Sequence, residues 1–319
     1  MGAVGAMNFK VGMLLSTRRM LFGLVALLGI VGNLRAQAVD TVALRSLGEA
    51  SSSQLYDTAL GLQFRDSLLA YLQQHGGLAA AVPRLQGLAD IRDSLRTLRI
   101  LTWGHRLRDH TWCYLGLVVH QLPGESPRYY PLRDRRIPVG QGLVPEEWLF
   151  YRCSPNDWVG AVYFDIIPFA LPTQETAYLL LGVAGATDFV TRRVVEVLQP
   201  TEQSLLFGMP YISYGRQHYG RLIFAHGSRV GMNMLYLSKF HLLLMDHLSP
   251  AKEEYFDMPQ YYGPDFSFDA LRLQPNGRWL FEPNVDVRPY LPEPRKRPVR
   301  QATGHGNPQL GQYVPNWKH

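Results

Sequence analysis

The chain has 319 residues, of which 46% are hydrophobic and 18% are charged, and it carries a formal net charge of +6. This composition is typical of a globular protein and excludes an intrinsically disordered one. The basic excess lies in residues 1–36 and 291–319, at the two ends of the chain. The charge therefore gives no reason to expect a nucleic-acid-binding surface on the fold.

The first 38 residues have the pattern of a signal peptide. Lys10, Arg18 and Arg19 precede the apolar run 20–34, and small residues at 36–38 offer a cleavage site. An uncleaved membrane anchor is the alternative, but it needs about 20 apolar residues, and no cysteine near the site offers a lipid anchor. We expect an exported protein, periplasmic or outer-membrane-associated, with no transmembrane anchor after cleavage.

Residues 39–97 are predicted to form an N-terminal helical segment. A helix is expected over 53–75, ended by Gly76-Gly77, and Pro83 can open a further helical turn that extends to Ile91. The periodic apolar residues that predict the first helix are Tyr56, Leu60, Phe64, Leu68, Tyr71 and Leu72.

Residues 98–290 are predicted to form a β-rich domain. Alternating or continuous apolar runs indicate strands near 98–103, 111–120, 158–167, 176–181, 222–226, 232–237 and 240–246. The apolar run 176–181 is expected to be buried on both faces. A tight turn is expected at Ser238-Lys239. A final hairpin is expected to turn at Pro275-Asn276-Gly277, where Asn-Gly tolerates the positive φ of a two-residue turn.

The short connections between these strands predict a mainly β fold. They favour an antiparallel meander, either a sandwich or a partly open barrel, preceded by the helical segment. No alternation of strands and helices indicates a Rossmann-type fold. The proline-rich basic tail 291–319 is predicted to be extended and poorly ordered.

The chain contains two cysteines, Cys113 and Cys153. In an oxidising compartment such a pair can form a disulfide bond. Cys113 lies in an apolar strand, so a buried free thiol is the alternative interpretation.

No familiar catalytic motif occurs. The sequence has no G-x-S-x-G, H-E-x-x-H, C-x-x-C, phosphate-binding loop or EF-hand loop. The glycine pair Gly182 and Gly185 is interpreted as part of a turn.

One segment gathers groups that could carry chemistry, and it is expected to be a loop between the meander and the final hairpin. Its candidate residues are Asp246, His247, Tyr262, Asp265 and Asp269. The aspartates could cap backbone N–H groups, which is the structural interpretation. Alternatively, two carboxylates could serve as acid and base in a glycan hydrolase, or the three aspartates could bind Ca²⁺.

Several short stretches resemble an uncharacterised family of exported proteins of Bacteroidota, over most of residues 98–288. They are 99–103, 114–116, 246–250, 262–269, 276–279 and 285–288. The resemblance implies export and a cell-envelope setting, but it brings no established activity and no catalytic residues.

The function expected from these observations is binding of a protein or glycan partner in the cell envelope. The alternative is a carboxylate-dependent hydrolase of cell-wall or imported glycans. Tyrosines in or near predicted loops could anchor a partner or pack across strands; they are Tyr129, Tyr130, Tyr211, Tyr214, Tyr219, Tyr261 and Tyr262. The arrangement of the aspartates distinguishes the two functions, because a hydrolase needs two carboxylates about 5–9 Å apart across an open cleft.

Overall fold

The computed structural model describes residues 41–53, 58–135, 145–185 and 187–290. The predicted signal peptide 1–38 and the predicted tail 291–319 lie outside these ranges. The helices are α2 (Thr41–Ser53), α3 (Thr58–Gln74), α4 (Glu147–Phe150) and the 3₁₀ helices η1 (Gly77–Ala79), η2 (Pro155–Asp157), η3 (Ser238–Phe240), η4 (Glu253–Tyr255), η5 (Pro259–Tyr261) and η6 (Arg288–Tyr290). The strands are β1 (Ala89–Arg92), β2 (Leu98–Arg106), β3 (Trp112–His120), β4 (Arg128–Arg133), β5 (Val162–Ala170), β6 (Thr176–Gly185), β7 (Val190–Pro200), β8 (Leu205–Phe207), β9 (Ile212–Tyr214), β10 (Gln217–Tyr219), β11 (Arg221–Gly227), β12 (Met234–Leu237), β13 (Leu242–Pro250), β14 (Tyr262–Leu273) and β15 (Trp279–Glu282).

The strands of the described residues form three sheets, which we number in chain order. Sheet I has the strand order β1-β2-β3-β4, sheet II the order β11-β7-β6-β5, and sheet III the order β10-β9-β15-β14-β13-β12. All pairings are antiparallel except that of β15 with β9, and β8 pairs with the end of β7. The prediction of a mainly β, antiparallel fold with N-terminal helices is confirmed.

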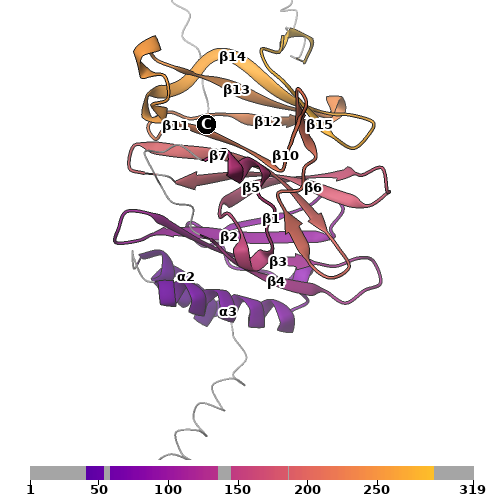
Figure 1. The fold of residues 1–319 in the computed structure, drawn as a ribbon. Coiled ribbons are helices and arrows are strands. Elements are labelled where there is room, and N and C mark those ends of the chain that lie inside the picture. Colours follow the sequence, from indigo (N-terminus) through magenta and orange to yellow (C-terminus); the bar gives the residue numbers. More distant parts are fainter. Residues whose placement is uncertain (1–40, 54–57, 136–144, 186, 291–319) are drawn as a thin grey trace, which may run out of the picture. The chain divides into compact units, whose positions relative to one another are not determined.

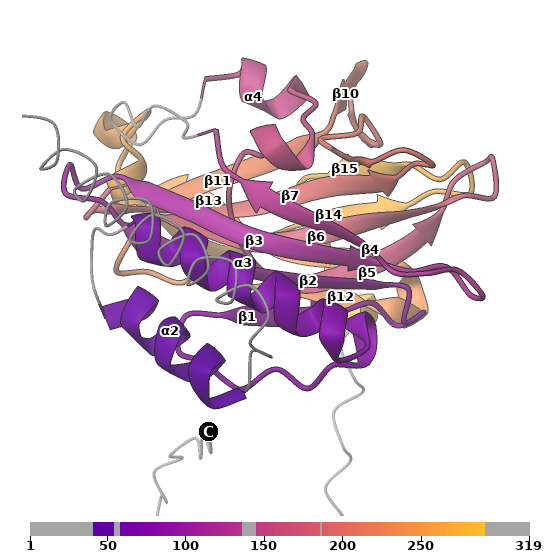
Figure 2. The same cartoon turned by 90° about the horizontal axis from the view of Figure 1, so that it is seen from below.

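The three sheets are stacked, and helices α2 and α3 cover sheet I (Figure 1). One hydrophobic cluster joins α2 and α3 to sheet I, a second joins sheet I to sheet II, and a third joins sheet II to sheet III. Figure 2 shows α2 and α3 lying across sheet I. Sheet II is covered on both faces, so Tyr178, Leu179, Leu180 and Leu181 of β6 are all buried, as the apolar run predicts.

Helix α3 follows the predicted apolar spacing, because Phe64, Leu68, Tyr71 and Leu72 are buried against sheet I. The helical turn predicted from Pro83 to Ile91 is wrong. Residues 89–92 form β1, which pairs with β2, and Arg99 of β2 donates to both oxygens of Asp90, at 2.8 and 2.6 Å. This tertiary ion pair outweighs the weak local helical spacing.

Two predicted turns differ in length. The turn after β12 includes the 3₁₀ helix Ser238–Phe240 and then His241 at a φ of 49°, so it is longer than the predicted pair. In the final hairpin the Gln274 N–H donates to Arg278 O at 2.7 Å, which closes a loop of residues 275–277. The hairpin at Pro275-Asn276-Gly277 is therefore confirmed, but its loop has three residues, of which only Gly277 has a positive φ, of 72°, and is not the two-residue turn expected.

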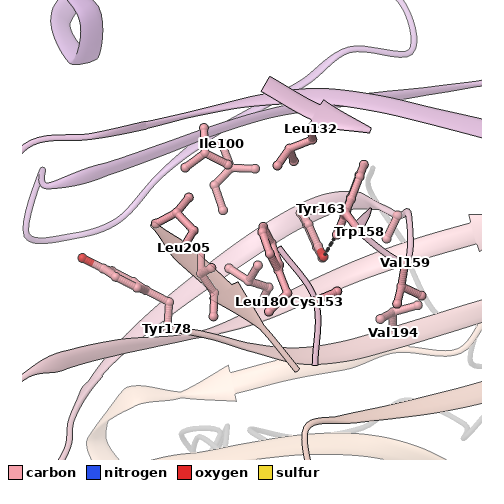
Figure 3. Packing of buried hydrophobic residues seen from close by; sticks show 14 of the residues in the cluster. Ile100, Leu132, Cys153, Trp158, Val159, Tyr163, Tyr178, Leu180, Val194 and Leu205 are labelled. Atoms are coloured by element: carbon pink, nitrogen blue, oxygen red, sulfur yellow. Dashed lines mark hydrogen bonds between the residues drawn. The ribbon is translucent and has the colours of Figure 1, made fainter. Parts of the chain in front are cut away.

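Figure 3 shows the core between sheets I and II, where Trp158 Nε1 donates to the Tyr163 hydroxyl at 2.9 Å. Tyr163 in turn donates to Glu196 of β7, and Arg221 of β11 donates through Nε to Glu196 Oε1 at 2.8 Å. Arg221 also donates to the carbonyl of Tyr151 at 2.7 Å. The Arg221 and Glu196 side chains are 0% and 1% exposed. Because this cluster is closed to solvent, it is a structural ion pair and not a catalytic site.

In this structure both cysteines are buried and free, which favours the free-thiol interpretation over the disulfide. Cys113 Sγ donates to Asp134 Oδ1 at 3.8 Å, whereas Cys153 Sγ accepts from Arg221 Nη2 at 3.6 Å. The two thiols are thus directed to different polar partners. Burial raises the pKa of the Cys153 thiol to about 12, so it stays protonated and unreactive at neutral pH.

We therefore expect two thiols per chain in denatured, unreduced protein. The native protein is expected to react slowly with a thiol reagent, because both side chains are buried. Ellman titration before and after denaturation measures both quantities. Finding no thiol in the denatured, unreduced protein would restore the disulfide.

Candidate functional site

The five candidate residues lie on two paired strands rather than in a loop. Asp246 and His247 belong to β13, and Tyr262, Asp265 and Asp269 belong to β14. The register of this pair shifts between Asp246 and Leu248, where His247 of β13 lies opposite the three residues 265–267 of β14, which marks a β-bulge in β14. The loop expected from the dense Asp, Pro and Gly content is therefore wrong, since these residues are accommodated in the bulge and in the first part of β14, which pairs with β13 but not with β15.

Each of the three aspartates accepts a backbone N–H. Asp246 Oδ2 accepts from Asn233 N at 2.7 Å, and Asp265 Oδ1 accepts from Ser267 N at 3.0 Å. Asp269 Oδ1 accepts from Asn284 N at 3.1 Å, and its other oxygen contacts His247 Nδ1 at 2.9 Å. This arrangement matches the structural interpretation of the aspartates.

The same contacts do not suit a carboxylate-dependent hydrolase. The Ser267 hydroxyl lowers the pKa of Asp265, which opposes the raised pKa that a general acid needs. Within the described ranges, no group of three or more His, Cys, Asp or Glu side chains is placed to hold a metal ion. The three aspartates therefore do not form the ligand cluster that the calcium interpretation requires.

A groove of about 1170 Å³ opens beside these strands. One wall is formed by the β6–β7 connection and the end of β11 in sheet II, with Phe189, Arg229 and Val230. The other wall is formed by the end of β13, the start of β14 and the residues between them, with Tyr261, Tyr262 and Asp265. The groove therefore combines aromatic and aliphatic surface with a few charged and polar groups, which is typical of a binding site.

Several apolar side chains that line the groove are exposed to solvent. Phe189, Val230, Met258 and Tyr261 line it and are exposed. A monomeric protein seldom gathers exposed apolar side chains at one place unless a partner covers them.

Phe266 does not line the groove itself, but it follows the groove residue Asp265 and is the most exposed large apolar residue of the described chain. Its side chain is 95% exposed and its φ is 71°. A positive φ costs a bulky residue about 1–2 kcal/mol, and exposure gives no burial energy in return. Asp265 fixes this conformation, because Oδ1 accepts from both Ser267 N at 3.0 Å and Ser267 Oγ at 2.7 Å.

The sequence predicted two residues of one wall of the groove. Tyr262 and Asp265 line it, whereas Asp246, His247 and Asp269 do not. It missed Phe189, Arg229 and Val230, which lie far along the chain from the candidate segment. The available signal was an aromatic residue, Phe189, in the short connection that follows Gly185 between two strands.

No family model, no curated protein and no solved structure matches this chain. The likeness to exported proteins of Bacteroidota stays a prediction. In the described part of the chain, none of the helices has the length and apolar character needed to cross a membrane.

Proposed function

We propose that this protein is an exported cell-envelope protein that acts by binding a partner in the groove between sheets II and III. The observation that carries the proposal is Phe266, an almost fully exposed aromatic residue held at a positive φ next in sequence to the groove residue Asp265. Folding alone gives no reason to keep such a residue there. Strained residues of this kind concentrate at binding sites, where the cost is compensated by the partner.

The groove chemistry also supports binding. Aromatic and aliphatic side chains supply contact area, and Arg229, Gln260 and Asp265 can orient a partner by hydrogen bonds. The engaged carboxylates support binding over hydrolysis, because none of the three aspartates is placed as an unpartnered acid or base.

A charge placed in the groove tests this proposal. Val230 lines the groove and is 42% exposed, so Val230→Asp is expected to leave the fold intact. Leu122 is 44% exposed in the β3–β4 turn, and Leu122→Asp is the matched control. Binding to the purified chain beginning at residue 39 is measured with two probes, a soluble peptidoglycan glycan fragment and a random dodecapeptide phage library.

We expect saturable binding of at least one probe, weakened about tenfold or more by Val230→Asp and unchanged by Leu122→Asp. Equal effects of the two substitutions would contradict a site in the groove. The absence of saturable binding by both probes would overturn the proposed function.

A further inference from the structure

Strand β11 differs from the other edge strands of the described sheets. Strands β1, β10 and β12 are only four, three and four residues long. Strands β4 and β5 contain Pro131 and Pro168, and β5 also has a bulge. These are the devices by which proteins protect sheet edges from pairing with other chains. Strand β11 has seven residues, an unbroken register with β7, and neither proline nor lysine.

The hydrogen bonds of β11 alternate along the strand. Ser228 N donates to Phe189 O, and Gly220 O accepts from Val197 N, so the even-numbered residues between them face β7. The backbone groups of Ile223 and Ala225 therefore point away from the sheet. On that side they make no backbone hydrogen bond to any residue within the described ranges.

These open groups lie next to apolar surface. Leu222, Ile223, Phe224 and Ala225 are half-buried, so each still offers side-chain area. Helix α4 approaches the start of β11, where Arg221 donates to the carbonyl of Tyr151 just after that helix. At the other end, the carbonyl of Gln260 in η5 lies 2.8 Å from the position of a Cβ on Gly227. The open part of the edge thus lies between α4 and η5.

The edge continues into the groove. Gly227 ends β11 and lines the groove together with Ser228, Arg229 and Val230. The Arg229 side chain is exposed and has no hydrogen bond or ion pair with the described residues. A partner that follows β11 would therefore meet a cation and then the aromatic side chains of the groove.

We propose that β11 accepts an extended polypeptide segment of a partner protein as an added strand, whose end enters the groove. A polypeptide backbone presents alternating N–H and C=O groups at the spacing of a strand, which complements Ile223 and Ala225. Glycan hydroxyls lack this regular spacing. The exposed Arg229 favours an acidic group on the segment where it enters the groove. This inference names the partner class of the proposed function and rests on it.

Amide hydrogen exchange in the chain without any partner gives the first test. The amides of Ile223 and Ala225 should exchange about 100-fold faster or more than those of Leu222, Phe224 and His226, because only the second set donates to β7. Equal protection of both sets would show that the edge is already covered and would overturn the inference.

Peptides selected from the dodecapeptide library give the second test. Ala225→Pro removes the outward N–H without removing a bond to β7, so it should weaken peptide binding about tenfold or more, whereas Ala225→Ser should not. Methylation of alternate backbone nitrogens in the selected peptide is the matched experiment on unaltered protein. One set of alternate positions should abolish binding and the other should not.

The remaining outcomes separate this inference from the proposed function. Binding of the glycan probe alone, unaffected by Ala225→Pro, would overturn the added strand and leave groove binding intact. A dimer that Ala225→Pro converts to monomers would show that a second copy of this chain occupies the edge, which also overturns the inference. Binding of neither probe would overturn both proposals.

Discussion

Replacing Arg221 by methionine is expected to lower the free energy of unfolding by about 3–5 kcal/mol. Arg221 and its partner Glu196 are completely buried, and Arg221 also donates to the carbonyl of Tyr151. Its removal leaves a carboxylate in the core without its cation and the buried carbonyl of Trp148, to which Arg221 also donates, without its donor. Both are costly because no water replaces the lost partner.

Two further variants identify the cause of this loss. In Arg221→Met with Glu196→Leu the uncompensated charge is removed, so the double variant should recover at least half of the stability. Arg65→Met removes an ion pair with Asp66 that is exposed on the carboxylate side, and it should change stability by less than about 1 kcal/mol. Urea unfolding of the three variants measures the differences. A loss below about 1 kcal/mol for Arg221→Met would contradict the structural role of the pair.

Strands set by local chemistry could be predicted from the sequence, whereas strand β7, which contains one partner of the Arg221–Glu196 ion pair, could not. The final hairpin follows from local chemistry, because Gly277 tolerates the positive φ of its turn and Trp279 then pairs back to Leu273. Strand β7 was missed because Arg192, Arg193 and Glu196 interrupt its apolar pattern. Burial of Glu196 is possible only because Arg221 lies on the neighbouring strand.

For the candidate site too, the sequence predicts the part that depends on local chemistry and not the part that depends on how the sheets stack. Local turn chemistry identified Asp265, whose bonds to Ser267 involve residues close in sequence. The opposite wall of the groove, with Phe189 and Val230, is brought there by the stacking of sheets II and III. No local sequence pattern predicts how two sheets stack, so this wall of the groove could not be predicted from the sequence.

Replacing Phe266 by glycine is expected to separate stability from binding. Glycine adopts a positive φ without strain, and the exposed phenyl ring contributes no burial, so the free energy of unfolding should stay unchanged or rise by up to about 1 kcal/mol. Binding of the selected peptide should nevertheless weaken about tenfold or more, because the aromatic anchor is lost. Urea unfolding and peptide titration of the same protein sample measure the two effects.

Arg96→Gly is the matched control for this prediction. Arg96 is also exposed and has a positive φ of 57°, but it lies in the β1–β2 turn, far along the chain from the groove residues. Its replacement should affect stability in the same direction and leave binding unchanged. A clear loss of stability in Phe266→Gly would show that the ring packs in the folded protein and would contradict a role in binding.

The pH dependence of binding follows from the residue that holds Phe266 in place. Hydrogen bonds from the Ser267 hydroxyl and N–H lower the pKa of Asp265 below its ordinary value of 3.8. Because this pKa is lowered, the ionised carboxylate stabilises the turn fully at any pH above the ordinary pKa. The stabilisation is lost only as the pH falls through the lowered pKa. The conformation of Phe266 should therefore persist from about pH 5 to 8, and Phe266→Gly should weaken peptide binding by the same factor across that range. A factor that disappears at the acidic end would show that a group other than Asp265 positions the ring.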